Sequence, residues 1–271
     1  MATSDPPRRP RALPWVRGLI GVAAFLLVAE VLSVTGVISR SALPPISTVL
    51  GQAVLLLGNA QFLGDLAATV EAWMAGLAIT VAVGVPAGLV LGSVPGVCSA
   101  TRAVVEFLRP IPPVALIPLV ALVVGPGLRM NLTLVVYAAI WPVLFNTIYG
   151  LDDVDPVAKD TLRAFGFGRS DVIRRVCLPA AAPFIATGIR VASSIALIVS
   201  IATGILTGRI DGNGIGAFIS DANTAGKINP VLAAALWAGV LGLALNALLL
   251  WVERRVLPWH HAYLEEAEAA K

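Results

Sequence analysis

Charged side chains are scarce in this chain. Only 13% of its 271 residues are Asp, Glu, Lys or Arg, and 58% are hydrophobic. Soluble domains carry about 25% charged residues, and the mean hydropathy here is +0.88. This balance excludes an ordinary soluble domain and indicates a membrane protein. Because a spanning helix needs roughly 20 apolar residues, the length allows about six spans and no large soluble domain.

Residues that bind metals or perform catalysis are also few. Cys98 and Cys177 are isolated thiols, and His260 and His261 are the two histidines. The sequence has neither a CxxC pair nor a Cys/His cluster, so no metal site is predicted. An HExxH motif, a Ser/His/Asp set and a GxxxxGK[ST] loop are missing as well. These absences argue against a membrane enzyme and against an ATPase.

Apolar runs divide the chain into predicted spans. Residues 1–15 are rich in Pro and Arg and are predicted to be a disordered cytoplasmic leader. The segment at 43–59, with Ser47 or Thr48 as its cap, is predicted to be a surface helix on the outer side. Residues 209–230 are predicted to be a polar outer loop. The predicted spans are 18–37, 66–94, 99–124, 131–149, 184–206 and 231–252.

Small and helix-breaking residues mark two of these runs. Glycines recur at multiples of four residues in the second run, which favours close packing against another helix. The third run is interrupted by RPIPPVALIP, at 109–118. Four prolines in that stretch predict a broken helix, which is tolerated at membrane depth where it lines a cavity or is buried in protein. The glycines are Gly76, Gly84, Gly88 and Gly92.

The distribution of basic residues predicts the orientation. Six spans place both termini on one side of the membrane. That side holds 15 of the 19 Lys and Arg residues, and the other side holds four. By the positive-inside rule the first side is cytoplasmic. The longest polar interval, at 152–183, lies on this side between the fourth and fifth spans.

This polar interval is predicted to form two short helices. Asp153 or Asp155, followed by Pro156, favours a helix at 157–165. Gly166, with Gly168, permits a sharp turn. A second helix at 170–177 is expected to be broken by Leu178-Pro179 just before the fifth span.

The interval resembles the cytoplasmic loop of binding-protein-dependent ABC importer permeases of type I. The family pattern is EAA, three residues, Gly, nine residues, Ile, one residue and Leu-Pro. Here the same spacing joins Asp160-Thr161-Leu162, Gly166, Val176 and Leu178-Pro179. RPIPPVALIPL, FNTIYGLDDVD and GNGIG, which begin at residues 109, 145 and 212, are similar to the taurine, alkanesulfonate and nitrate branch.

The resemblance implies an all-α membrane protein with about six transmembrane helices, the type I ABC importer permease fold and both termini cytoplasmic. It implies a permease domain at 16–258, with a coupling loop at 151–180, and a cytoplasmic tail at 259–271. The residues that would contact an ATPase subunit are Asp160, Thr161, Leu162, Arg163, Ala164, Phe165, Gly166, Phe167, Gly168, Arg169, Leu178 and Pro179.

The same resemblance implies the partners. A second permease, identical or different, would complete the pore, and a substrate-binding protein would deliver the solute from outside. ATP and Mg²⁺ would be bound by the ATPase subunits, so this chain would bind no cofactor directly. The expected location is the inner or plasma membrane of a bacterium, and no nucleic acid is expected to bind.

The solute is expected to be a small anion, such as a sulfonate, nitrate or an organic acid. Arg109 would attract an anion or anchor to headgroups, and Glu30 is either functional or interfacial. Thr69, Ala72 and Gly204 stand where the branch usually has Ser, Arg and an acid, which weakens any transfer of substrate. The predicted pathway residues are Arg109, Pro112, Asn146, Ser193, Ser194, Ser200 and Thr203.

An ion-coupled secondary transporter is the alternative from another class. Such proteins often show internal repeats and paired interrupted helices. This sequence has one interrupted run and no repeat, and it has few charges inside the spans to carry protons. These features favour the ABC permease.

Overall fold

The computed structural model describes residues 14–39 and 44–258, and every regular element in these ranges is helical. The predicted tail at 259–271 and residues 1–13 of the predicted leader lie outside the described residues, whereas Pro14 and Trp15 already belong to the first helix. The helices are α1 (Pro14–Val34), α2 (Ile46–Leu56), α3 (Ala60–Ser93), α4 (Pro95–Leu108), α5 (Ile117–Val124), α6 (Leu128–Asp152), α7 (Pro156–Ala164), α8 (Arg169–Val172), α9 (Leu178–Thr207), α10 (Ile215–Thr224) and α11 (Ile228–Val256).

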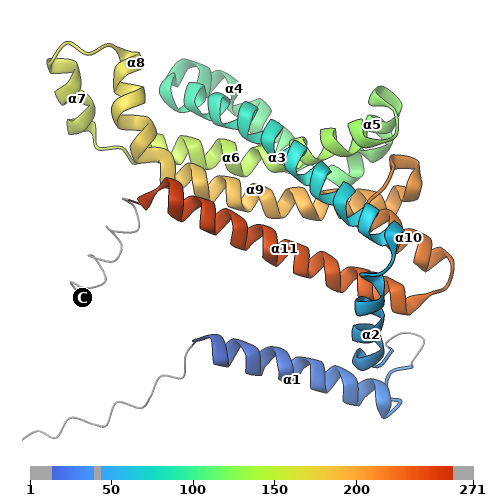
Figure 1. Ribbon diagram of the computed structural model, residues 1–271. Helices are drawn as coiled ribbons and strands as arrows, with labels where there is room; N and C mark the ends of the chain where they lie inside the picture. Colours follow the sequence, from blue (N-terminus) through green and yellow to red (C-terminus); the bar gives the residue numbers. More distant parts are fainter. Residues whose placement is uncertain (1–13, 40–43, 259–271) are drawn as a thin grey trace, which may run out of the picture.

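Helices α3, α6 and α9 form the centre of the bundle (Figure 1). The predicted close packing of the α3 glycines is confirmed, because each of them faces α6. A Cβ built on Gly76 would lie 2.5 Å from Val135, and one built on Gly88 would lie 2.6 Å from Thr147. Both pairs are offset by the same number of residues, so α3 and α6 run parallel in a fixed register.

In the part of the chain that the structure describes, four helices are long and apolar enough to cross a membrane: α3, α6, the segment Arg169–Ile210, and α11. A fifth crossing is counted if α4 and α5 form one bent pair, whose halves meet at 85°. The break lies where the prolines predicted it, between Leu108 and Pro113. The apolar stretch of α1 at Ile20–Val34 is shorter than the roughly 20 residues of a typical spanning helix. Six spans therefore stay a prediction.

The predicted helix break at Leu178-Pro179 is wrong. Helix α8 continues through a π-helical turn, Ile173–Cys177, directly into α9. Proline normally breaks a helix because its ring clashes with the carbonyl four residues earlier and because it has no N–H. The wider π turn lies immediately before Pro179, where that clash would fall, and so lets the helix pass without interruption. The fifth predicted span consequently begins earlier than residue 184.

The predicted polar loop at 209–230 is also wrong in part. Its middle forms α10, whose Ile215, Phe218 and Ile219 are buried against residues of α2, α3 and α11. The apolar IGAFI segment supplies this face. Gly216 permits the approach of α10 to α9, because a Cβ there would clash with the carbonyl oxygen of Ile201. The turn cluster therefore brings a short helix against the end of α9 instead of forming an open loop.

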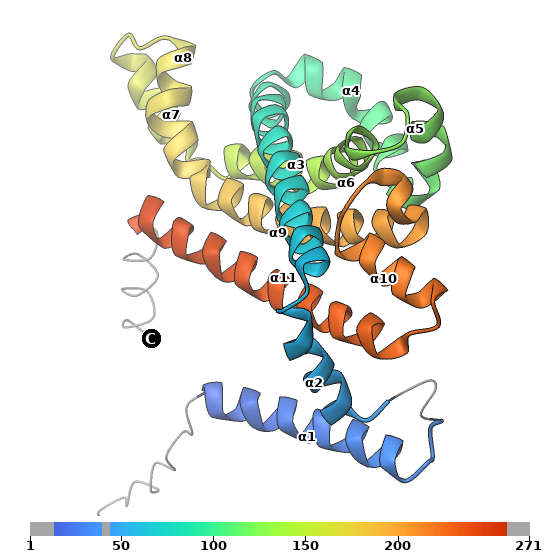
Figure 2. The same cartoon turned by 45° about the vertical axis from the view of Figure 1, so that its right-hand side comes forward.

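Helix α1 lies beside the rest of the bundle and is connected to it by α2, as two views show (Figures 1 and 2). The predicted helix is confirmed as α2, but its place on the outer side stays a prediction, and neither Ser47 nor Thr48 caps it through its own side chain. Instead the Glu30 carboxylate accepts hydrogen bonds from the Ser47 N–H, at 3.1 Å, and from the Ser47 hydroxyl, at 2.9 Å. Glu30 thus joins α1 to the first turn of α2, where a negative charge is favourable.

Candidate functional site

Helices α7 and α8 project from one end of the bundle, beyond the end of α11, as both ribbon views show (Figures 1 and 2). Asp155 caps α7 by accepting a hydrogen bond from the Val157 N–H at 2.8 Å, and Pro156 occupies its first turn. Gly166 has φ +80, so it makes the turn that was predicted between the two helices. The predicted helix–turn–helix of the loop is therefore confirmed.

The projecting tip exposes apolar side chains. Phe165 is 78% exposed and Val157 is 70% exposed. Asp160 and Arg163, expected to pair with a partner, form an exposed ion pair with each other at 3.0 Å. Such a surface ion pair contributes little to stability, so both charges remain available to another protein. The residues predicted to contact an ATPase stay a prediction.

The residues predicted to line the pathway do not lie together. Ser193 is buried, and both its hydroxyl and its carbonyl oxygen accept a hydrogen bond from the Trp73 indole N–H. Ser194 faces a cavity between α9 and α11. Ser200 and Thr203 are buried near the opposite end of α9. Ser193 and Ser194 share the cavity between α9 and α11, and Arg109 and Asn146 share a different one, which Pro112 adjoins at the break after α4.

Arg109 and Asn146 line a chamber of about 480 Å³ between the broken helix, α6 and α9. The guanidinium of Arg109 lies 4.7 Å from the centre of the Phe145 ring. The amide of Asn146 donates to the Pro142 carbonyl oxygen at 2.8 Å. The location agrees with the cavity that was expected between the broken segment and the fifth span.

Four aromatic residues of α6 form one wall of this chamber, and the sequence prediction did not include them. Tyr137 and Trp141 meet edge to face at 6.0 Å, and Phe145 and Tyr149 stack at 6.2 Å. Their spacing of four residues places them on one face of a helix. That spacing is visible in the sequence and is the signal that could have identified them.

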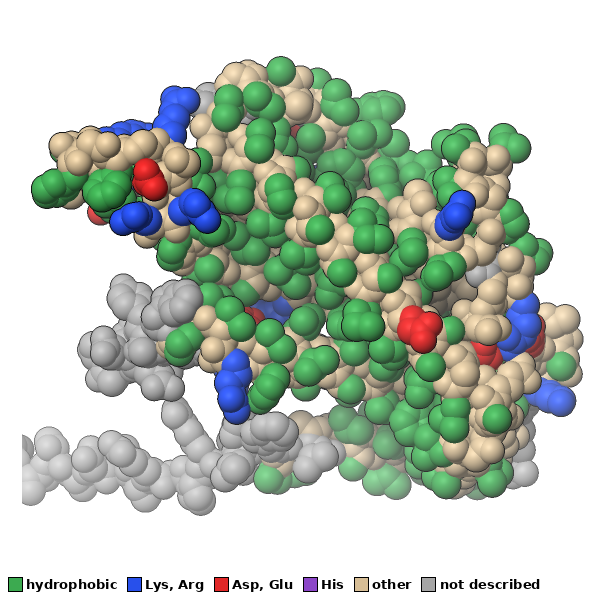
Figure 3. Space-filling model, turned by 45° about the horizontal axis from the view of Figure 1, so that its top comes forward, with side chains coloured by type: hydrophobic (Ala, Val, Ile, Leu, Met, Phe, Trp, Pro, Cys, Tyr) green, Lys and Arg blue, Asp and Glu red, His purple; other side chains and the backbone are tan. Residues whose placement is uncertain are grey.

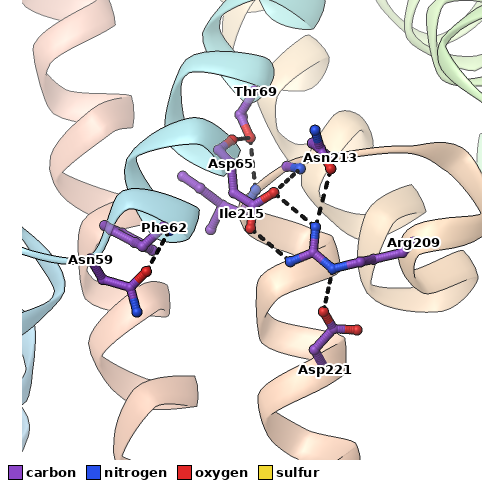
Figure 4. A network of polar contacts seen from close by, with 9 residues as sticks. Asn59, Phe62, Asp65, Thr69, Arg209, Asn213, Ile215 and Asp221 are labelled. Atoms are coloured by element: carbon purple, nitrogen blue, oxygen red, sulfur yellow. Dashed lines mark hydrogen bonds and ion pairs between the residues drawn. The ribbon is translucent and has the colours of Figure 1, made fainter.

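A second polar cluster holds the opposite end of the bundle together, and sequence reasoning missed it (Figure 4). Asp65 of α3 is 1% exposed and accepts two hydrogen bonds from Arg209, at 3.2 and 2.9 Å. It also accepts one from the Gly214 N–H at 3.0 Å, and the neighbouring Thr69 accepts one from the Ile215 N–H. This cluster fixes the segment between α9 and α10 to α3.

Charged side chains on the visible face gather at the two ends of the bundle and are sparse between them (Figure 3). One group covers the projecting α7 and α8, and the other lies beside α10. The intervening surface is mostly apolar in this view. A hydrophobic band between two polar ends is the pattern expected for a protein held in a bilayer.

Comparison with known proteins agrees with this geometry. Residues 84–258 match the family model described as "Binding-protein-dependent transport system inner membrane component". The chain is 30% identical to the nitrate import permease protein NrtB of Leptolyngbya laminosa, over 72% of this chain and 68% of that protein. It is 29% identical to the putative aliphatic sulfonates transport permease protein SsuC of Bacillus subtilis, over 92% and 89% respectively.

A solved structure shows the same fold. A chain in the crystal structure of a bacterial alginate ABC transporter, in complex with an alginate-pentasaccharide-bound periplasmic protein, superposes with a TM-score of 0.63. The match covers 90% of this chain and 94% of that chain at 15% identity. At this identity the likeness concerns the fold alone.

Proposed function

Because the chain belongs to the family of binding-protein-dependent transport system inner membrane components, we propose that it carries a small anion into a bacterial cell, powered by separate ATPase subunits. It is a multi-pass permease subunit of an ABC importer. The proposal adds the solute class, the bacterial inner membrane, the coupling residues and a second permease that completes the pore. ATP and Mg²⁺ would be held by the ATPase subunits.

The exposed tip of α7 is the observation that carries the coupling proposal. Phe165, the residue that follows α7, is 78% exposed and therefore buries little apolar surface against this chain. Aromatic side chains that enter a partner's pocket dominate many protein interfaces. Phe165 would be such an anchor, with Asp160, Arg163 and Arg169 at its polar rim. The unbroken connection from α8 to α9 would pass movement of the tip into the membrane.

Replacing Phe165 with serine tests this coupling. Loss of an aromatic anchor costs about 2 kcal/mol or more, so binding of the ATPase subunits should weaken about 30-fold. The tagged permease is purified from its native membrane, and the bound ATPase subunits and their ATP hydrolysis are measured. Val256→Ser is the matched control, because Val256 is 61% exposed at the same end of the bundle but lies on α11. Equal retention of the ATPase by both variants would refute the proposal.

The anion proposal is supported by Arg109 and by the relatives, whose names specify nitrate and aliphatic sulfonates. Arg109 is the only charged residue among those that line the chamber in the described part of the chain. In the purified assembly, with its binding protein, anions should stimulate ATP hydrolysis, and cations or neutral sugars should not. Stimulation by a neutral sugar alone would contradict the anion assignment.

A further inference from the structure

We propose that the chamber at the break between α4 and α5 binds an organic anion that carries an aromatic ring. The inference rests on the proposed function and narrows its solute class. It is carried by the combination of one unpaired cation, a row of four aromatic rings and a cavity volume far above that of an inorganic ion.

The charge of the chamber selects an anion. Arg109 lines the cavity, and no carboxylate is found among the lining residues that the structure describes. Arg109 also forms no ion pair with any described residue. Its guanidinium is held 4.7 Å from the Phe145 ring centre in a cation–π contact. Its N–H groups donate to none of the described residues, so they can bind a carboxylate or sulfonate with two parallel hydrogen bonds.

The aromatic wall selects a ring. Tyr137, Trp141, Phe145 and Tyr149 follow one another along α6; the first two rings meet edge to face and the last two stack. A planar ring that enters the chamber can pack against these rings in the same way. Such ring contacts stabilise binding more than apolar contact alone. The Tyr137 hydroxyl is already used, because it donates to the Leu108 carbonyl oxygen at 2.6 Å. This bond fixes the wall to the end of α4 next to Arg109.

Two polar groups remain available beside the rings. The indole N–H of Trp141 is buried and has no hydrogen-bond partner among the described residues. A buried donor of this kind is destabilising unless a ligand or another group accepts from it. Asn146 has used its N–H₂ group on Pro142, so its carbonyl oxygen can accept from a substituent of the ring. The chamber therefore offers both a donor and an acceptor in addition to Arg109.

The cavity volume separates an aromatic anion from an inorganic one. The chamber measures about 480 Å³, within the range of about 300–1,000 Å³ found for sites that bind organic ligands. A water molecule takes up about 30 Å³ in the liquid, and a four-atom ion such as nitrate is only a little larger. Nitrate would leave most of the chamber filled with water against aromatic rings, whereas the ring and carboxylate of an aromatic acid would displace more of that water and cover more of the rings.

The test uses the purified permease–ATPase assembly in lipid nanodiscs without ATP. Binding of benzoate is followed by saturation-transfer NMR, with empty nanodiscs as the blank. Cyclohexanecarboxylate keeps the charge without the aromatic ring, and benzamide keeps the ring without the charge. Both should bind several-fold more weakly than benzoate, because each lacks one of the two contacts. Nitrate at the same concentration should not displace benzoate.

Variants then place the binding in the chamber. Arg109→Gln should weaken benzoate binding about tenfold, since a charge-assisted contact is lost. Trp141→Leu should weaken benzoate binding without affecting cyclohexanecarboxylate, and it serves as an independent variant if Arg109→Gln assembles poorly. Arg129→Gln is the matched control, because Arg129 is exposed on α6 outside the chamber.

Three results would overturn the inference: equal binding of benzoate and cyclohexanecarboxylate, displacement of benzoate by equimolar nitrate, or unchanged binding in Arg109→Gln. Its failure can be told apart from failure of the proposed coupling, because binding is measured without ATP. An assembly that loses its ATPase with Phe165→Ser but does not bind benzoate disproves the aromatic solute alone. An assembly that binds benzoate but keeps its ATPase in Phe165→Ser disproves the coupling alone.

Discussion

Replacing Asp65 with asparagine is expected to loosen the segment 208–216 that joins α9 to α10. The carboxylate accepts two hydrogen bonds from Arg209 and one from the Gly214 N–H while only 1% exposed (Figure 4). Asparagine keeps one acceptor oxygen but presents an N–H₂ group where the second oxygen stood. That group opposes a guanidinium N–H, so a charge-assisted hydrogen bond is replaced by a contact between two donors.

The free-energy cost of Asp65→Asn depends on the contacts that Arg209 retains. A hydrogen bond to a charged group contributes about 1.5–3 kcal/mol, and breaking a buried pair costs more when the remaining charge is left without a partner. The Arg209 side chain is 34% exposed and still pairs with Asp221 and Asn213, so water and these partners offset part of the loss. We expect a cost of about 2–3 kcal/mol, equivalent to about 30- to 150-fold more frequent opening of the segment.

Amide hydrogen exchange measures this opening directly. The Gly214 and Ile215 N–H groups donate to Asp65 and Thr69, so the peptide that contains them should exchange faster in Asp65→Asn by the stated factor. Asp221→Asn is the control. Asp221 is 44% exposed, and a surface pair contributes at most about 1 kcal/mol. Unchanged exchange in Asp65→Asn, or equal effects of the two variants, would refute the reasoning.

Two further substitutions test the packing of α3 and α1. Gly88→Ala should lower the thermal unfolding temperature, because its Cβ would lie 2.6 Å from Thr147. Gly64→Ala on the same helix is the control. Its Cβ meets nothing within 4 Å, so this substitution should leave the unfolding temperature unchanged or raise it. Glu30→Gln should increase proteolysis between α1 and α2, because the Ser47 contacts lose their charge. The second idea fails if Glu30→Gln and wild type are cleaved at the same rate.

The parts of the fold that sequence predicted are those governed by local rules. The glycines of α3 are four or eight residues apart, so they share one helix face, and that face was found against α6. Gly166 was expected to turn the chain and does so with φ +80. The prolines after Leu108 interrupt the third run as expected. In each case the residue type itself restricts the backbone or the packing, independently of residues that are distant in the chain.

The parts that were missed depend on residues distant in the chain. Asp65 precedes the predicted start of its span, and its partner Arg209 is 144 residues later, so nothing nearby signals the pair. Ser193, which stays a predicted pathway residue, accepts a hydrogen bond from Trp73, 120 residues earlier, and nothing near it in the sequence signals that contact. Pro179 was expected to stop a helix, and the π turn that accommodates it has no marker in the sequence.

The helix that begins at Arg169 and ends at Thr207 is long enough to act as a lever. At about 1.5 Å per residue it extends about 60 Å, roughly twice the hydrocarbon thickness of a bilayer. One end joins the projecting α7, and the ion pair between Asp65 and Arg209 holds the segment that follows the other end to α3. If a partner protein pushed on α7, we would expect the helix to pivot about the held end. The π turn, whose hydrogen bonding is less regular, is where we would expect such a helix to bend first.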